Sequence, residues 1–194
     1  MPMMKGSKFL FLANLFVYSM AMSASQEPTP TEVTEILALA EQGDAEAQNE
    51  LGSWYYAGRG VAKDDIEAAR WIGLAADQGH VPAQYNIGLL YFRNRGVDGN
   101  DTEAAKWYRR AAEQGYAPAQ GALGYMLAYG AGVEENTVMA YMWLELARNG
   151  ATDEFTRRLY AQQRYELAQR RAPAEIAEAT RLAQEWEAAR PRQR

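Results

Sequence analysis

The sequence of 194 residues contains no cysteine and a single histidine. Without cysteine the chain has no disulfide, no thiolate zinc site, no thiol nucleophile and no cysteine for lipid attachment. One imidazole, that of His80, excludes any site that needs two histidine ligands, such as the HExxH metalloproteases. The formal net charge of −5 argues against a basic nucleic-acid-binding surface. An acidic chain remains, 48% hydrophobic, with room for one folded domain and a tail.

The chain also lacks a hydrophobic run long enough to cross a membrane. Its longest uncharged, mostly apolar run is 9–22, which is shorter than the roughly 20 residues that a spanning helix needs. Two lysines precede this run and the small residues Ser-Ala-Ser follow it, an order typical of a secretory signal peptide cleaved after Ser23 or Ser25. We therefore expect residues 1–25 to be a signal peptide rather than a membrane anchor. The protein would then be periplasmic or secreted, and would touch a membrane only before cleavage.

The clearest pattern in the chain is a repeat with a spacing of 36 residues. The pair Ala47-Gln48 recurs as Ala83-Gln84 and again as Ala119-Gln120. At the same spacing the chain repeats a leucine or isoleucine, a glycine, a Gly-Val pair, two alanines and a tryptophan. Agreement over three copies predicts a solenoid, because one short unit cannot bury its own apolar face and must stack on its neighbours.

Each copy has the pattern of two helices joined by a turn. Ala47, Leu51 and Tyr55 are spaced to share one face of a helix. The turn that follows is rich in glycine and asparagine, which adopt positive φ most readily. Glu67 and Glu103 are spaced to complete capping boxes at the second helices. The expected N-cap residues of those second helices are Asp64, Asn100 and Asn136.

Three glycines, Gly52, Gly88 and Gly124, lie inside the predicted first helices. Glycine in a helix interior costs about 1 kcal/mol relative to alanine. The simplest compensation is close contact, because a residue without Cβ lets the two helices of one copy approach almost backbone to backbone. We expect the tryptophans at positions 71, 107 and 143 to wedge between neighbouring copies.

These motifs resemble the Sel-one-like repeat family of bacteria, a relative of the tetratricopeptide repeats. The residues that carry the resemblance are the Leu-Gly pair, the tyrosine three residues after its glycine, the Gly-x-Gly-Val turn, and the alanines and tryptophan of the second helix. The resemblance implies an all-α fold, a right-handed α/α solenoid of helix hairpins with helical caps. Leu127 replaces the expected tyrosine in the third copy, which ends one residue early. The expected repeats are 44–79, 80–115 and 116–151.

Both ends of the array are expected to be capped. Residues 26–43 would form a linker and an N-terminal capping helix, since Thr29, Pro30 and Glu32 are suited to a helix start. Residues 152–194 would form a helical extension with helices near 153–170 and 174–189. This extension is mildly basic and the body is acidic. It would therefore fold back on the solenoid or serve as a contact arm, and we favour the first.

No motif for catalysis, a metal or a cofactor stands out. The turn sequences such as Gly58-Arg59-Gly60 lack the third glycine and the preceding strand of a dinucleotide site. His80 occupies a turn position, and the carboxylates of Asp64, Asp65 and Glu67 recur in a pattern that favours capping over metal binding. We therefore predict no enzymatic activity, no metal and no cofactor.

The other face of each first helix is the candidate binding surface. Resemblance to tetratricopeptide-like solenoids implies that these helices line a concave groove. Its residues differ between copies whereas the core positions agree, as recognition would require. Aromatic side chains of this kind commonly anchor protein partners, although Tyr56 and Phe92 could instead pack between repeats. The groove residues are Asn49, Glu50, Ser53 and Tyr56; Tyr85, Asn86, Leu89 and Phe92; and Gly121, Ala122, Tyr125 and Tyr129.

Three functions are open at this point. The first is an exported, non-enzymatic scaffold or adaptor in the cell envelope that binds a protein or peptide; the resemblance implies roles in envelope scaffolding and regulation. The second is a module that binds an envelope glycan by stacking on the groove tyrosines. The third is a β-lactam-interacting hydrolase like the cysteine-rich relatives, which loses support because their paired cysteines are absent.

Overall fold

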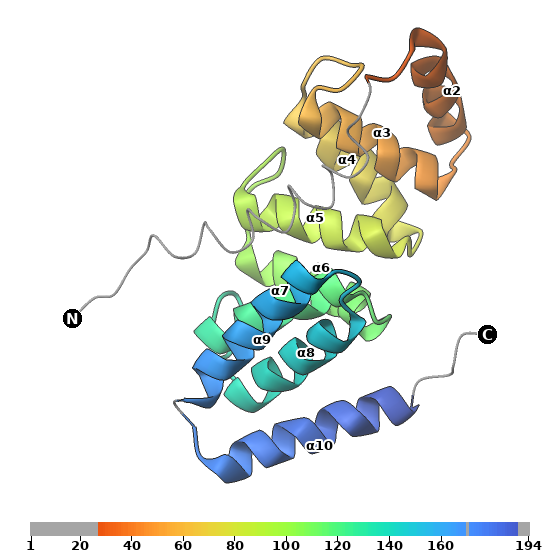
Figure 1. Ribbon diagram of the computed structural model, residues 1–194. Coiled ribbons are helices and arrows are strands. Elements are labelled where there is room, and N and C mark those ends of the chain that lie inside the picture. Colours follow the sequence, from red (N-terminus) through yellow and green to blue (C-terminus); the bar gives the residue numbers. More distant parts are fainter. Residues whose placement is uncertain (1–26, 170, 190–194) are drawn as a thin grey trace.

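The computed structural model describes residues 27–169 and 171–189, so the predicted signal peptide lies outside the described residues. Over these residues the chain forms nine α-helices and no strand (Figure 1). None of these helices is long and apolar enough to cross a membrane. The helices are α2 (Pro30–Glu41), α3 (Ala45–Ala57), α4 (Asp65–Asp77), α5 (Val81–Arg93), α6 (Asp101–Glu113), α7 (Ala117–Tyr129), α8 (Thr137–Gly150), α9 (Glu154–Ala168) and α10 (Pro173–Ala189).

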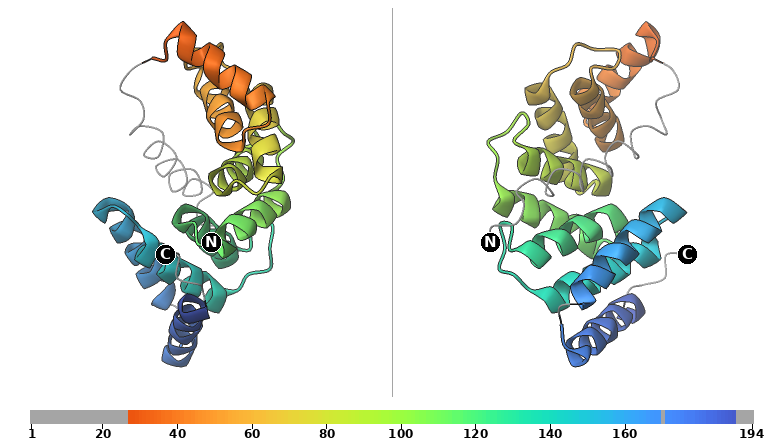
Figure 2. Two further views of the ribbon diagram at one scale, coloured as in Figure 1. Left: turned by 90° about the vertical axis from the view of Figure 1, so that its right-hand side faces the viewer. Right: turned by 60° about the vertical axis from the view of Figure 1, so that its left-hand side comes forward.

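The helices stack as antiparallel pairs. α3 packs on α4, α5 on α6 and α7 on α8, and successive pairs meet through α4 with α5 and α6 with α7. α2 packs on α3 as a half unit before the first pair. The array follows an arc with α2 at one end and α10 at the other (Figures 1 and 2). The predicted all-α solenoid is therefore confirmed.

Helix starts follow the expected capping chemistry in most places. α2 begins with a complete capping box, in which the Glu32 N–H donates to Thr29 Oγ1 at 3.2 Å and the Thr29 N–H donates to Glu32 Oε2 at 2.6 Å. Asp64 and Asn100 each accept two backbone N–H groups at the starts of α4 and α6. These side chains satisfy donors that a helix end leaves unpaired.

The reciprocal bonds predicted for Glu67 and Glu103 are wrong. The Glu67 carboxylate pairs with Arg70 at 2.7 Å, and that of Glu103 pairs with Lys106 at 2.6 Å. The backbone N–H groups of Asp64 and Asn100, which a capping box would use, instead donate to the Tyr55 and Tyr91 carbonyls at 3.0 and 3.2 Å. The starts of α4 and α6 are therefore capped by the side chains of Asp64 and Asn100, without the reciprocal glutamate bond.

The three helical glycines lie where the two helices of each pair meet, as predicted. A Cβ added at Gly52 would lie 2.6 Å from Ile72 Cγ1, and one at Gly88 would lie 2.9 Å from two ring carbons of Tyr108. Gly124 is enclosed in the same way by α8. Real Cβ atoms do not tolerate such distances, so the absence of a side chain sets the spacing of the pair.

A second set of glycines joins neighbouring units. Gly60, Gly96 and Gly132 lie in the turns after α3, α5 and α7, with φ of 68°, 67° and 66°. A Cβ at Gly96 would collide with the Asp65 carbonyl at the start of α4, and one at Gly132 with the backbone of Asp101 at the start of α6. Each of these two turns therefore rests on the second helix of the preceding unit.

Buried side chains also link each unit to its neighbours. Trp71 shares an apolar cluster with Ala40 of α2 and Leu51 of α3, as the wedge prediction requires. The repeated glutamines form amide hydrogen bonds that the sequence analysis did not anticipate. Gln48 Nε2 donates to the Ala40 carbonyl at 3.0 Å and Gln78 Nε2 donates to Gln48 Oε1 at 2.7 Å. These bonds satisfy a polar side chain that is only 5% exposed.

The C-terminal extension folds back on the last unit. Both α9 and α10 pack mainly on α8. Arg164 of α9 pairs with Glu145 of α8, and Trp186 of α10 meets Trp143 edge to face with ring centroids 5.7 Å apart. Tyr160 of α9 is fully buried against the backbone of α7. The array thus ends in two helices that cover the last hairpin rather than continue it.

Candidate functional site

The inner side of the arc carries a continuous row of side chains from three successive first helices. In the left view of Figure 2, α3, α5 and α7 lie toward the open side of the arc. Direct contacts between side chains show that these helices are neighbours along this side. We call this row the inner stripe. Its members are Asn49, Ser53 and Tyr56 of α3; Asn86, Phe92 and Arg93 of α5; and Tyr125 and Tyr129 of α7.

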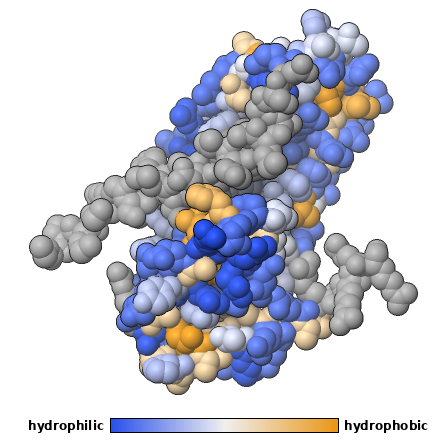
Figure 3. All heavy atoms as spheres, in the orientation of Figure 1, coloured by the Kyte–Doolittle hydropathy of each residue, from blue (hydrophilic) through white to orange (hydrophobic). Residues whose placement is uncertain are grey.

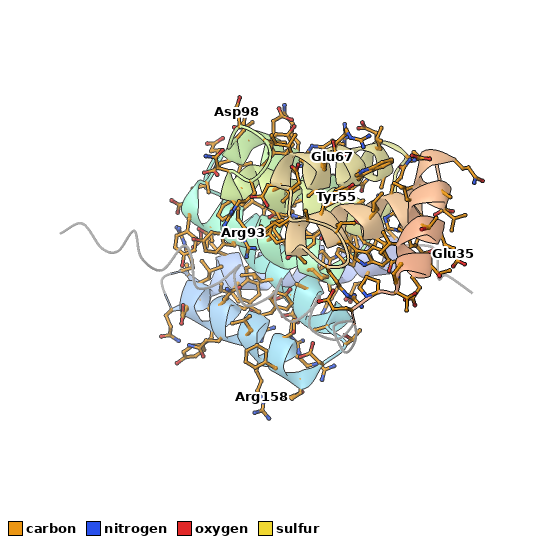
Figure 4. The ribbon with its side chains drawn as sticks, turned by 90° about the horizontal axis from the view of Figure 1, so that it is seen from above. Glu35, Tyr55, Glu67, Arg93, Asp98 and Arg158 are labelled. Atoms are coloured by element: carbon orange, nitrogen blue, oxygen red, sulfur yellow. The ribbon has the colours of Figure 1, made fainter. Side chains whose placement is uncertain are left out.

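The part of the inner stripe between α3 and α5 is polar. Asn86 Nδ2 donates to Asn49 Oδ1 at 2.9 Å, and Arg93 Nη1 donates to Tyr56 Oη at 3.2 Å. Lys63 lies 5.7 Å from the centre of the Tyr56 ring. Viewed from above, Arg93 lies inside the outline of the molecule, whereas Glu67 lies near its far edge (Figure 4). These half-buried groups fix the positions of donors and acceptors that face the inside of the arc.

The part of the inner stripe between α5 and α7 is aromatic. Phe92 meets Tyr125 edge to face with ring centroids 6.5 Å apart, and Tyr125 meets Tyr129 at 4.7 Å. Burial raises the pKa of Tyr125 to about 12, with a smaller contribution from Tyr129. Tyr129 is 58% exposed, whereas Tyr125, which was predicted as a groove contact, is only 7% exposed and belongs to the core. This aromatic row ends in one open ring, the usual form of a hydrophobic anchor point.

Besides Tyr125, two more of the predicted groove residues, both on α5, are wrong as surface contacts. Tyr85 is 2% exposed and Leu89 is fully buried, because α5 is a middle helix with neighbours on most sides. The Tyr85 ring packs between Tyr108 and Tyr116, both at 5.6 Å, and burial raises the pKa of its hydroxyl well above the ordinary value. Both residues belong to the core.

The third unit also offers less groove than predicted. Gly121 and Ala122 are buried. A Cβ at Gly121 would collide with the Tyr160 ring of α9, so the C-terminal extension occupies this part of the inner side. No pattern within one repeat could have indicated this cover, because it comes from outside the repeats.

Arg93 is a member of the inner stripe that the sequence analysis missed. Tyr56 and Phe92 are 36 residues apart and so occupy the same repeat position, whereas Tyr129 occupies the position one residue later. The residues at 57, 93 and 129 are alanine, arginine and tyrosine. Comparison of that register across all three units would have found Arg93.

A hollow of about 780 Å³ opens at the N-terminal end, between α2 and α3. The predicted residue Glu50 lies in it, with Trp54 and Arg59. Burial raises the pKa of Glu50, and the nearby charge of Arg59 lowers it by a smaller amount. A smaller hollow of about 370 Å³, lined by residues including Arg109 and Leu127, lies by the turn after α7.

The described part of the chain holds no group of three histidine, aspartate or glutamate side chains placed to bind a metal. His80 stands at the N-cap of α5 without a side-chain capping bond, and burial lowers its pKa. Asp64 acts as the helix cap of α4, as its repeated position predicted.

Most of the surface visible in Figure 3 is hydrophilic, with small separate hydrophobic patches. Stacked helix pairs with a repeated core and a varied inner side define the class of α-solenoid repeat proteins, which generally bind other proteins. The chain belongs to the Sel1 repeat family, whose model matches residues 45–80, 81–116 and 117–150. These ranges begin one residue after the expected repeat boundaries.

Two solved structures show the same likeness. A Sel1 repeat protein from Oxalobacter formigenes is 35% identical with a TM-score of 0.59, over 67% of this chain and 97% of that one. The protein c5321, a protective antigen present in uropathogenic Escherichia coli strains that displays an SLR fold, is 25% identical with a TM-score of 0.57. That match covers 88% of this chain and 43% of c5321. No curated protein matches the chain.

Proposed function

We propose that this protein is an exported, non-enzymatic adaptor of the cell envelope that binds a protein partner along the inner stripe. The supporting observation is that the inner stripe joins polar groups in fixed positions to an exposed aromatic ring, on the side of the solenoid where residues differ between repeats. Membership of the Sel1 repeat family supports the protein-binding role. The proposal of export rests on the N-terminal sequence, outside the described residues.

Site-specific photo-cross-linking tests the binding surface. A photoreactive residue at Ser53, on the inner stripe, should capture a partner in the envelope fraction. The same residue at Leu74, which is 42% exposed on α4, provides the control. Equal capture from both positions, or none from Ser53, would overturn the inner stripe as the site.

A matched pair of tyrosine variants tests the aromatic anchor. Tyr129→Ala should weaken capture by about thirtyfold or more, since a well-packed aromatic anchor contributes about 2 kcal/mol or more to binding. Tyr165→Ala provides the control because Tyr165 is also exposed, at 60%, but lies on α9. Both variants should keep the melting temperature of the parent. Loss of binding in both would contradict a specific role for Tyr129.

A glycan is the second candidate ligand, favoured by the open ring of Tyr129 beside Tyr125. One combined result would replace the adaptor proposal with glycan binding. A purified cell-wall glycan would bind the parent but not Tyr129→Ala, and a photoreactive residue at Ser53 would capture no protein.

Mass spectrometry of the protein from the envelope fraction tests export separately. A mature N-terminus after Ser23 or Ser25 is expected, and retention of the first 25 residues in the cytoplasm would contradict it.

A further inference from the structure

The hollow between α2 and α3 is acidic around an apolar floor. Four carboxylates and one cation line it together with apolar side chains from both helices. Its carboxylates belong to Glu27, Glu32, Glu35 and Glu50, its cation to Arg59, and its main apolar residues are Ile36, Leu39 and Trp54. A ligand that suits such a hollow carries positive charge on side chains with apolar stems, as arginine does.

Two of the four carboxylates are already engaged within the fold. Glu27 accepts from the Gly60 N–H at 3.2 Å, and Glu32 belongs to the capping box of α2. No hydrogen bond or ion pair joins Glu35 or Glu50 to another residue in the described part of the chain. Because burial disfavours the charged form of Glu50 more than the nearby Arg59 favours it, Glu50 gains from a further cation placed beside it.

The opposite end of the same chain carries a sequence of complementary charge. Residues 190–194 read Arg-Pro-Arg-Gln-Arg, three arginines with no acidic residue. α10 ends at Ala189, at the far end of the arc from α2 in both Figure 1 and Figure 2. A contact between these arginines and the hollow of another molecule joins opposite ends of two copies.

We propose that residues 190–194 of one copy bind in the acidic hollow of a second copy, which joins the copies head to tail. Guanidinium groups pair with Glu35 and Glu50 in the two-pronged geometry that arginine and carboxylate favour. The contact uses two different surfaces, so it adds copies head to tail, as an open chain or, where the rotation between copies closes, as a ring. This association lies beyond the partner-binding role and uses no residue of the inner stripe.

Analytical ultracentrifugation of two complementary variants tests the proposal. A tail variant carries Arg190→Gln, Arg192→Gln and Arg194→Gln, and a hollow variant carries Glu35→Gln and Glu50→Gln. The parent should form species that grow with concentration, and each variant alone should sediment as a monomer. A mixture of the two should stop at a 1:1 dimer, because only one intact hollow and one intact tail remain to meet.

Salt and a charge-matched control complete the test. Association of the parent should be lost between about 0.01 M and 1 M salt, as the Debye length falls from about 30 Å to about 3 Å. A control with Asp77→Asn and Asp98→Asn removes the same charge from exposed positions elsewhere and should associate like the parent. Circular dichroism verifies that all variants remain folded.

The outcomes separate this proposal from the adaptor role. A parent that stays monomeric at low salt, or a mixture that forms no dimer, overturns the head-to-tail contact. So does weakening of association by the Asp77 and Asp98 control to the same degree. Tyr129→Ala should leave sedimentation unchanged, so failure of partner binding and failure of self-association are observed independently.

Discussion

At the scale of single residues, two helical glycines of this chain illustrate opposite effects of one substitution. Gly88 faces the Tyr108 ring, whereas a Cβ on Gly73 of α4 would meet nothing within 4 Å. The same change to alanine therefore adds helix propensity at both positions and a steric clash at only one. The pair separates the intrinsic cost of glycine from its structural use.

We expect Gly73→Ala to raise the free energy of unfolding by about 0.5–1 kcal/mol through helix propensity. Gly88→Ala should lower it by about 1–3 kcal/mol, because the added methyl group overpacks the contact between α5 and α6. Urea unfolding followed by circular dichroism measures both. A stabilised Gly88→Ala would show that α5 and α6 are not in close contact at this residue.

The buried hydroxyl of Tyr108 provides a second test at this scale. Its oxygen is buried and has no hydrogen-bond partner in the described part of the chain. An unsatisfied buried hydroxyl costs about 1–3 kcal/mol. Tyr108→Phe keeps the ring that packs on Gly88, so we expect it to match or exceed the parent in the free energy of unfolding at neutral pH.

The pH dependence of that difference has a definite sign. Burial raises the pKa of Tyr108 well above its ordinary value of 10.0, so only the unfolded state ionises readily. Ionisation of this tyrosine therefore leaves the free energy of unfolding of the parent unchanged below pH 10 and lowers it as the pH rises further. The advantage of Tyr108→Phe should therefore grow above pH 10. A clear loss of stability in Tyr108→Phe at neutral pH would instead indicate that the hydroxyl binds a buried water.

At the scale of helices, α10 packs mainly on one neighbour, α8. Its buried residues are Ala179 and Ala183, and Trp186 meets Trp143 of α8 edge to face. The pattern of one narrow apolar face is typical of a helix held by tertiary contact rather than by its own propensity.

Trp186→Ala should therefore release α10 while the repeats stay folded. Hydrogen exchange followed by mass spectrometry should show faster exchange in α10 and unchanged exchange in α5 and α6. Gln184→Ala, an exposed change on the same helix, provides the control. Equal loss of protection across all helices would show that α10 unfolds only with the whole molecule.

The helices also show where sequence reasoning succeeds. Helix pairs, N-caps and the contact glycines were predictable because each depends on residues within one repeat and recurs at the repeat spacing. The capping boxes at Glu67 and Glu103 failed because the N-cap N–H groups that they need donate to carbonyls of the preceding first helix. The burial of Tyr85, Leu89 and Gly121 was not predictable, since it comes from neighbouring helices and from α9, which no local pattern specifies.

At the scale of the whole molecule, the hollow at α2 is acidic, and the sequence that follows α10 is rich in arginine. Acidification should therefore dissociate head-to-tail chains before it unfolds the monomer. Burial raises the pKa of Glu50, so its charge disappears at a higher pH than that of an ordinary glutamate. Sedimentation across a pH series, with circular dichroism on the same samples, measures both events. Chains that persist after Glu50 is protonated would contradict its role in the contact.

The turn glycines have a consequence for how such a protein can change in length. Gly96 and Gly132 each pack against the start of a second helix one unit earlier, and the middle unit supplies both halves of this contact, the turn glycine and the helix start. A duplicated block of 36 residues, the length of the first two repeats, would thus bring its own turn glycine and its own helix start. The neighbouring units would then need no substitution to pack on it. Arrays of this kind can lengthen by whole modules, whereas an insertion of any other size would leave a joint without its counterpart.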